Sequence, residues 1–375
     1  MENTGIFQDA QTGGLRRKTL VGIVWVTGTQ VGRQVAYFVV SVILARMLTP
    51  QDYGLVGMVL IFTQFATLLS ELGLGAALIQ RESIQEIHCS SVFYANIIMG
   101  LVLTVFTIVL SPFLANFFHE PRLASLSRLI AVNFTITSLN TVPHALISRK
   151  MEFWRSAIVE ITAVVVAGIV AIILAKLGWG VWSLVWQMLI TSATTTIALF
   201  LVTGWHPSLR FDRSALADLW RFSGHLLSFN AINYWIRHSD NLLVGKFFDA
   251  AALGIYARAY SLMLLPLTQI TSILTKVMFP ALSRIQNDKD AVKRIYLRSL
   301  ALIAMITFPM MFGLWVVSEH FVLALLGPRW SEVIPILRVF CLVGAVQSLS
   351  TTTGWIYQSQ GRTDMMFRWG LGAGI

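Results

Sequence analysis

Polar side chains line one face of the first long apolar segment, residues 20–44. Gln30, Arg33, Gln34 and Tyr37 fall within about 120° of arc on a helix that turns about 100° per residue. Amide and phenol groups suit the hydroxyl groups of a sugar, although they also join helices by hydrogen bonds. An arginine among them can bind a ligand or pair with an acid. The pattern predicts a polar face that meets water or a ligand.

A later apolar segment, residues 223–246, repeats this polar stripe. Four of its polar residues lie 200 positions after polar residues of the first stripe. We therefore interpret the stripe as a duplicated feature of the chain. The polar residues of the second stripe are Asn230, Asn233, Tyr234, Arg237 and Asn241.

Two arginines lie deep within these segments. Arg33 and Arg237 are about 14 Å or more from either end of their helices, too far to reach a membrane surface readily. Each costs several kcal/mol unless it faces a cavity or a partner. Two alternatives to a ligand role stay open: an ion pair of Arg237 with Asp240, and an ion pair of Arg33 with Glu71.

Three further charged residues lie within apolar segments. Glu71 shares a face with polar residues of the second segment, and it is a candidate for coupling to a proton or sodium ion as well as for plain pairing. Asp240 is the second candidate for ion coupling. Arg258 is one or two turns inside the segment 252–280, where it either contributes a cation to the cavity or only extends to the membrane surface.

The composition excludes an ordinary soluble fold. Of 375 residues 56% are hydrophobic and 12% are charged, and the mean hydropathy is +0.70. An outer-membrane barrel is excluded as well, because its strands would alternate in short segments. We predict an all-α membrane protein with about 10–11 transmembrane helices, the last beginning near Phe367. The ten complete apolar segments cover residues 20–44, 54–79, 90–115, 123–147, 156–175, 180–203, 223–246, 252–280, 297–317 and 333–357.

The basic residues are distributed unequally between alternate connections. With a cytoplasmic N-terminus, seventeen Lys and Arg flank cytoplasmic connections and five flank the other side. This is the asymmetry that the positive-inside rule describes, so topology explains most of the net charge of +10 without nucleic acid. We predict a multi-pass membrane protein with its N-terminus in the cytoplasm.

The chain contains an internal repeat. When the sequence is aligned with itself, Gly54 matches Gly254 at an offset of 200 residues, and Arg128 matches Arg338 at an offset of 210. Six segments fit into the first copy, an even number, so the two copies share one orientation. We predict an N-terminal six-helix lobe over 1–210 and a C-terminal lobe over 211–375. The second lobe holds four helices and the start of a fifth, and we expect it to be C-terminally incomplete.

Several kinds of chemistry lack a sequence signature. No phosphate-binding glycine loop with its lysine occurs, and no clustered Cys and His suggests a metal site. Cys89 and Cys341 are too far apart in sequence for a known motif, and we interpret both as inert. We expect no cofactor, no metal and no catalytic residues.

Two runs of the sequence carry a family signature: LARMLTPQDYGL at residues 44–55 and ELGLGAALIQR at residues 71–81. They resemble the signature of the Wzx-type polysaccharide flippases of the multidrug/oligosaccharidyl-lipid/polysaccharide exporter superfamily. The resemblance implies two facing six-helix lobes that turn an undecaprenyl-diphosphate oligosaccharide from the cytoplasmic to the outer leaflet. It also implies cavity cations on the first and eighth spans, where Arg33 and Arg258 lie, and a polysaccharide polymerase with its chain-length machinery as partners.

The resemblance and the composition favour a secondary flippase, not driven by ATP, that works in polysaccharide biosynthesis by rocking two lobes. A diphosphate requires cations in a water-filled cleft, because an unpaired buried charge is prohibitively costly. A small-cation multidrug antiporter of the same superfamily is one alternative, although it would require acids in the cavity. A membrane glycosyl polymerase or ligase and a structural scaffold are the others. The polymerase would require a long outer loop, which the sequence lacks.

Overall fold

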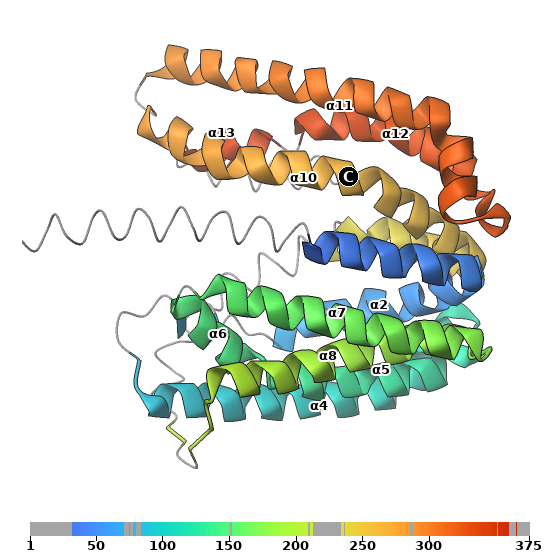
Figure 1. The fold of residues 1–375 in the computed structure, drawn as a ribbon, viewed down its shortest axis with the longest axis vertical. Coiled ribbons are helices and arrows are strands. Elements are labelled where there is room, and N and C mark those ends of the chain that lie inside the picture. The colour runs from blue at the N-terminus through green and yellow to red at the C-terminus, as the bar shows by residue number, and fades with distance from the viewer. Residues whose placement is uncertain are drawn as a thin grey trace, which may run out of the picture. The chain divides into compact units, whose positions relative to one another are not determined.

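The chain folds into two compact units, Met1–Trp235 and Ile236–Ile375. Every element within the described residues is helical, which confirms the predicted all-α class (Figure 1). The lobe boundary near residue 210 stays a prediction. The computed structural model describes residues 32–70, 75, 78–79, 84–150, 152–208, 211–212, 234–235, 237–285, 288–350, 352–359 and 365.

In unit 1 the helices pack as neighbouring pairs. α4 lies along α5, α7 lies along α8, and α5 also packs on α8 (Figure 1). A helix over residues 32–47 comes before them in the chain. The helices of unit 1 are α2 (Pro50–Ser70), α4 (Glu86–Phe118), α5 (Arg122–Ser138), α6 (Thr141–Arg149), α7 (Phe153–Lys176) and α8 (Val181–Thr203).

Unit 2 repeats part of this arrangement. α12 packs on both α11 and α10, and α13 packs on α10. The two longest helices begin at aspartate caps, because the Asp249 carboxylate accepts from the Ala252 amide and the Asp288 carboxylate accepts from the Ala291 amide. The elements are a helix over 237–247, α10 (Ala250–Arg284), α11 (Lys289–Leu325), the 3₁₀ turn η1 (Pro328–Trp330), α12 (Val333–Ser350) and α13 (Thr353–Ser359).

Six of the described helices are long and apolar enough to cross a membrane: α4, α7, α8, α10, α11 and α12. Predicted and observed ends differ mainly where polar turns extend a helix. The segment expected over 297–317 is part of the 37-residue α11, whose first ten residues include five basic or acidic ones. Charged residues lower the hydropathy of a segment without breaking its helix, so hydropathy alone ends the segment too early.

Two predicted spans are not single helices. The segment 123–147 divides into α5 and α6, and the segment 333–357 divides into α12 and α13. Pro143 stands in the first turn of α6, where its missing N–H and its ring would disrupt a continuous helix. In unit 2 the hydroxyls of Thr352 and Thr353 donate instead to carbonyls three residues back. The prediction of unbroken helices was wrong in both places.

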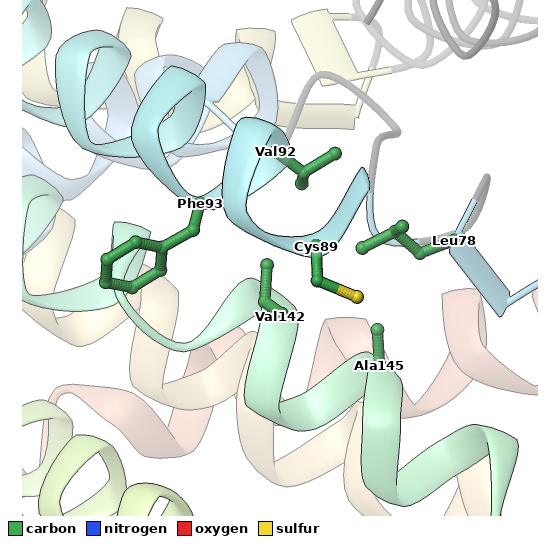
Figure 2. Close-up of a cluster of buried hydrophobic side chains, with 6 residues drawn as sticks. All are labelled: Leu78, Cys89, Val92, Phe93, Val142 and Ala145. Atoms are coloured by element: carbon green, nitrogen blue, oxygen red, sulfur yellow. The ribbon is translucent and has the colours of Figure 1, made fainter. Parts of the chain in front are cut away.

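Both cysteines are free and buried, as expected of inert residues. Cys89 lies in an apolar cluster with Val92 and Phe93 of α4 and with Val142 and Ala145 of α6 (Figure 2). Leu78 completes this cluster, and the Arg149 guanidinium donates to its carbonyl oxygen at 2.8 Å. The cluster joins α6 to the start of α4.

The chain that follows α8 is bound to the start of α4. α8 ends at Gly204, which has a φ of 59° that glycine adopts without strain. The Ser208 amide then donates to the Ser90 hydroxyl at 3.0 Å, and the Asp212 amide donates to the Ser91 hydroxyl at 2.9 Å. Both serine side chains are buried. These bonds fix the segment to unit 1.

Candidate polar centres of the two units

The helix over residues 32–47 packs closely against α7. A β-carbon added at Gly168 would lie 2.5 Å from Cγ2 of Val40, so only glycine allows this approach. One added at Gly32 would lie 3.7 Å from Cδ1 of Ile161, an ordinary contact. Gly32 and Val40 lie on either side of Arg33 in the sequence, so the first span approaches α7 along the stretch that carries Arg33.

Arg33 pairs with an acid on α7. Its Nη1 donates to Oε2 of Glu160, across 127 residues of sequence. The two side chains are 37% and 32% exposed, so the ion pair lies at an accessible surface. Glu71, the acid considered as a partner from the sequence, lies outside the described residues. The structure thus gives Arg33 a counter-ion that the sequence analysis did not identify.

Two other residues of the first stripe lie beside this pair. Tyr37 follows Arg33 by one helical turn and is 44% exposed, and Gln34 is half-buried. Arginine, amide and phenol therefore occur on one helix in unit 1. Gln30, the fourth predicted residue of the stripe, lies outside the described residues.

In unit 2 the acid of the second stripe has a different partner from the expected one. Oδ2 of Asp240 accepts a hydrogen bond from the Tyr256 hydroxyl at 2.9 Å, and Oδ1 accepts from the Asn241 amide at 2.7 Å. The Arg237 side chain is exposed and makes no ion pair with Asp240 in the described part of unit 2. The alternative ion pair of Arg237 with Asp240 was therefore wrong.

The remaining residues of the second stripe divide into three groups. Asn241 is half-buried beside Asp240. Tyr234 is buried in unit 1, where its hydroxyl donates to the Ile61 carbonyl at 2.6 Å and its ring lies 5.6 Å from that of Phe65. Tyr234 therefore serves packing and does not belong to an open polar face. Asn230 and Asn233 lie outside the described residues.

Arg258 contacts an aromatic ring. The Cζ atom of its guanidinium lies 5.4 Å from the centroid of the Trp330 ring, and Trp330 is fully buried. A guanidinium over an indole face is attracted by the ring quadrupole. Tyr256 and Arg258 are two residues apart on α10, about 200° around the helix, so they reach different partners. The structure thus brings Asp240 together with Tyr256 and brings Arg258 to η1.

The sequence analysis missed two residues of these centres. Glu160 is the one charged residue of the segment 156–175, and a lone acid in an apolar span is itself a functional signal. Tyr256 could have been found from the repeat, because Val40 and Val56 occupy the positions that Asp240 and Tyr256 hold 200 residues later. The paired exchange of two valines for an acid and a phenol indicates a contact.

Metal chemistry has no visible site among the residues that the structure describes. No group of three or more His, Cys, Asp or Glu lies close enough there to hold an ion.

The six long apolar helices make the chain a multi-pass membrane protein. The model of the polysaccharide biosynthesis protein family matches residues 43–335. The chain belongs to this family. Membership makes it a transporter and not an enzyme, which sets aside the polymerase and ligase alternatives.

Relatives with known names support the same assignment. The chain is 29% identical over 360 residues to the teichuronic acid biosynthesis protein TuaB of Bacillus subtilis (strain 168), covering 96% of this chain and 74% of that one. It is 28% identical over 361 residues to the lipopolysaccharide biosynthesis protein WzxC of Escherichia coli (strain K12), covering 95% and 73%. The resemblance to Wzx-type proteins found in the sequence is confirmed.

Solved structures share the fold. The lipid II flippase MurJ in an inward closed conformation superposes with a TM-score of 0.70 at 17% identity, covering 93% of this chain and 78% of that one. An inward-facing multidrug resistance transporter of the MATE family superposes with a TM-score of 0.64 at 18% identity, covering 88% and 82%. At such low identity these likenesses establish the fold alone.

Proposed function

We propose that this chain is a secondary flippase that moves an undecaprenyl-diphosphate oligosaccharide across the bacterial inner membrane. Two lobes, residues 1–210 and 211–375, rock about a central site and expose it alternately to either side. The names of the relatives, which refer to teichuronic acid and lipopolysaccharide biosynthesis, support this proposal. The polymerase and chain-length machinery that consume the product are its proposed protein partners.

The observation that carries the proposal is the half-exposed Arg33 within an apolar span. A guanidinium there can take two phosphate oxygens at once, which a lysine cannot. Neighbouring amide and phenol groups suit the sugar hydroxyls. The residues assigned to the substrate are Arg33, Gln30, Gln34 and Tyr37 of the first stripe, Asn230, Asn233, Arg237 and Asn241 of the second, and Arg258 of α10.

We assign ion coupling to two acidic residues of the apolar segments. Asp240 is the proposed coupling residue in unit 2, because its carboxylate is half-buried and is oriented by the Tyr256 hydroxyl. Glu71 is the corresponding proposal in the first lobe. An acid held by a neutral hydroxyl keeps its charge available to an ion, whereas one paired with arginine does not.

Substitution of Arg33 tests the proposal. In cells that lack their own exporter, Arg33→Ala should abolish surface polysaccharide and Arg33→Lys should retain part of it, because lysine keeps the charge and loses the two-point contact. Arg155→Ala is the matched control, since Arg155 pairs with Glu152 at the start of α7. With equal amounts of protein in the membrane, normal polymer output from Arg33→Ala would contradict the proposal.

The substrate class has a direct test. Native mass spectrometry of the purified protein should detect a co-purifying polyprenyl diphosphate with attached sugars. A sample that carries phospholipids alone, from cells that accumulate the lipid-linked sugar, would count against the assignment.

A cytoplasmic N-terminus is part of the proposal and follows from the unequal distribution of basic residues. Single cysteines at the exposed residues Ser125 and Lys289 should react with a membrane-impermeant maleimide from opposite sides. Ser125 should label in intact cells, and Lys289 only after the membrane is opened. Labelling of both from one side would refute this topology.

One observation favours a second function. The half-buried Asp240 supplies an acid of the kind that a small-cation antiporter requires. If the chain is such an antiporter, it should lower the accumulation of a cationic dye in cells, and Asp240→Asn should abolish that effect. A flippase should leave dye accumulation unchanged.

A further inference from the structure

Glu160 and Arg33 depend on each other for neutralisation. Glu160 is the single charged residue in the twenty-residue segment 156–175, and an ionised acid there costs several kcal/mol unless it is paired. Arg33 is held under the same constraint in the first span. Their contact satisfies both charges without any ligand.

The ion pair is accessible, and it uses one of the N–H donors of the Arg33 guanidinium. Arg33 has five N–H donors, and within the described residues one of them, on Nη1, is bonded to Glu160. Both side chains are about one-third exposed. An anion that reaches this surface therefore finds free donors on the guanidinium and a carboxylate already beside it.

The two helices that carry the pair are fixed. Gly168 brings α7 so close to Val40 that a β-carbon would have no room, and a β-carbon at Gly32 would lie 3.7 Å from Cδ1 of Ile161. An exchange of partners at Arg33 therefore requires rotation of side chains alone. Tyr37, one turn along the helix, is exposed next to the pair.

We propose that Glu160 is an exchangeable counter-ion that the diphosphate of the substrate displaces from Arg33. A diphosphate carries more charge than a carboxylate and accepts from both donor edges of the guanidinium, so it wins the competition. After transport Glu160 takes Arg33 back and promotes release. Glu160 thereby sets how strongly charged an anion must be to bind. This inference rests on the proposed function.

A purely structural role of Glu160, in which it only positions Arg33, predicts a different effect of its removal on diphosphate binding. If Glu160 competes with the substrate, its removal strengthens binding of a diphosphate. If Glu160 only positions Arg33, its removal leaves binding unchanged or weakens it. The sign of the change therefore separates the two roles.

The experiment is equilibrium binding of radiolabelled undecaprenyl diphosphate to the purified chain in detergent. Glu160→Gln should lower the Kd about tenfold, equivalent to about 1.4 kcal/mol. Glu152→Gln is the matched control, because it removes the same charge from the start of the same helix, where Glu152 contacts Arg155 at 3.1 Å, and it should leave the Kd unchanged. Uncharged undecaprenol should bind all variants equally.

Arg33 variants separate this inference from the proposed function. Arg33→Gln should weaken binding, and the double variant with Glu160→Gln should bind no more tightly than Arg33→Gln alone. An unchanged or higher Kd for Glu160→Gln, with Arg33→Gln still impaired, would overturn the counter-ion role and leave the arginine site standing. Wild-type binding by Arg33→Gln would overturn the arginine site itself.

A conservative variant guards against loss of folding. If Glu160→Gln yields no folded protein, Glu160→Asp keeps the charge but shortens the side chain, which loosens the contact with Arg33. The Kd of Glu160→Asp should lie between the wild-type value and the lower value expected when Arg33 has no counter-ion. A Kd at or above the wild-type value would refute the exchange.

Discussion

The α4–α5 pair of unit 1 and the α11–α12 pair of unit 2 are held by the same polar contact. Arg128 Nε donates to the Ser111 hydroxyl at 3.0 Å, and Arg338 Nε donates to the Ser318 hydroxyl at 2.9 Å. Both serines are fully buried, and each donates in turn to a carbonyl three residues back. The repeat seen in the sequence thus extends to individual hydrogen bonds.

Three turns further into the helices the two pairs differ. In unit 1 Gly100 faces Ser138, and a β-carbon at Gly100 would lie 2.8 Å from the Ser138 β-carbon. In unit 2 the corresponding residues are Thr307 and Ser348, whose hydroxyls lie 3.0 Å apart. At this position unit 1 achieves contact by close backbone approach and unit 2 by a hydrogen bond.

The first spans of the units differ more deeply. Unit 1 has a cation that is bound by an acid, Arg33 with Glu160, and unit 2 has an acid that is bound by a phenol, Asp240 with Tyr256. The contacts of α4 with α5 and of α11 with α12 therefore match between the units, whereas the polar contacts of the first spans do not.

The largest expected effect comes from the close approach in unit 1. Gly100→Ala should destabilise the protein by about 1–3 kcal/mol, because its methyl group would meet the Ser138 side chain and the Phe134 carbonyl at under 3 Å. Thermal unfolding in detergent measures this. Gly313→Ala in α11 is the control. No neighbouring atom would lie within 4 Å of the added β-carbon, and alanine favours a helix more than glycine does. Equal stability of the two variants would contradict the close packing.

Removal of the hydroxyl donor from the polar centre of unit 2 should destabilise the protein somewhat less than Gly100→Ala does. Tyr256→Phe leaves the Asp240 Oδ2 atom without its hydroxyl donor and should cost about 1–2 kcal/mol of unfolding free energy. Tyr260→Phe, one turn along α10 where the ring packs on Phe340, should cost little. If Tyr256→Phe unfolds at the wild-type temperature, the hydrogen bond does not stabilise unit 2.

The shared serines test whether the two copies are equivalent. Ser111→Ala and Ser318→Ala should each cost about 1 kcal/mol, because each leaves a guanidinium Nε without its acceptor. The two losses should agree within about 0.5 kcal/mol, and the double variant should show their sum. A loss in one unit alone would show that the matching distances do not reflect matching energies.

The smallest effect belongs to the acid that occurs in unit 2 alone. Glu319 pairs with Arg338 at 3.5 Å, but the two side chains are 58% and 42% exposed. Glu319→Gln should therefore change stability by less than about 0.5 kcal/mol, since exposed ion pairs contribute little. A loss as large as that of Ser318→Ala would mean that the acid, and not the serine, holds the arginine.

Hydropathy and the repeat predicted most of the fold. Apolar runs locate the spanning helices because burial in lipid requires them. The break at Pro143 was visible in the sequence, whereas the break before α13 depends on how Thr352 and Thr353 bond to the backbone. Such hydroxyl contacts leave no trace in a hydropathy profile.

The polar centres were only partly predictable. Helical periodicity relates Arg33 to Tyr37, because both lie on one helix. Partners on other helices require the packing, and Glu160 is 127 residues from Arg33. Helical phase also assigned Tyr234 to an open stripe, whereas its hydroxyl is bound to a backbone carbonyl of α2. Periodicity predicts which residues share a face of a helix, but it does not predict which other helix packs against that face.

The hydrogen bonds after α8 determine how the end of that helix responds to force. Ser90 and Ser91 retain the backbone amides of Ser208 and Asp212 at the start of α4. A pull on the chain at Asp212 therefore acts on these two hydrogen bonds before it can unwind α8.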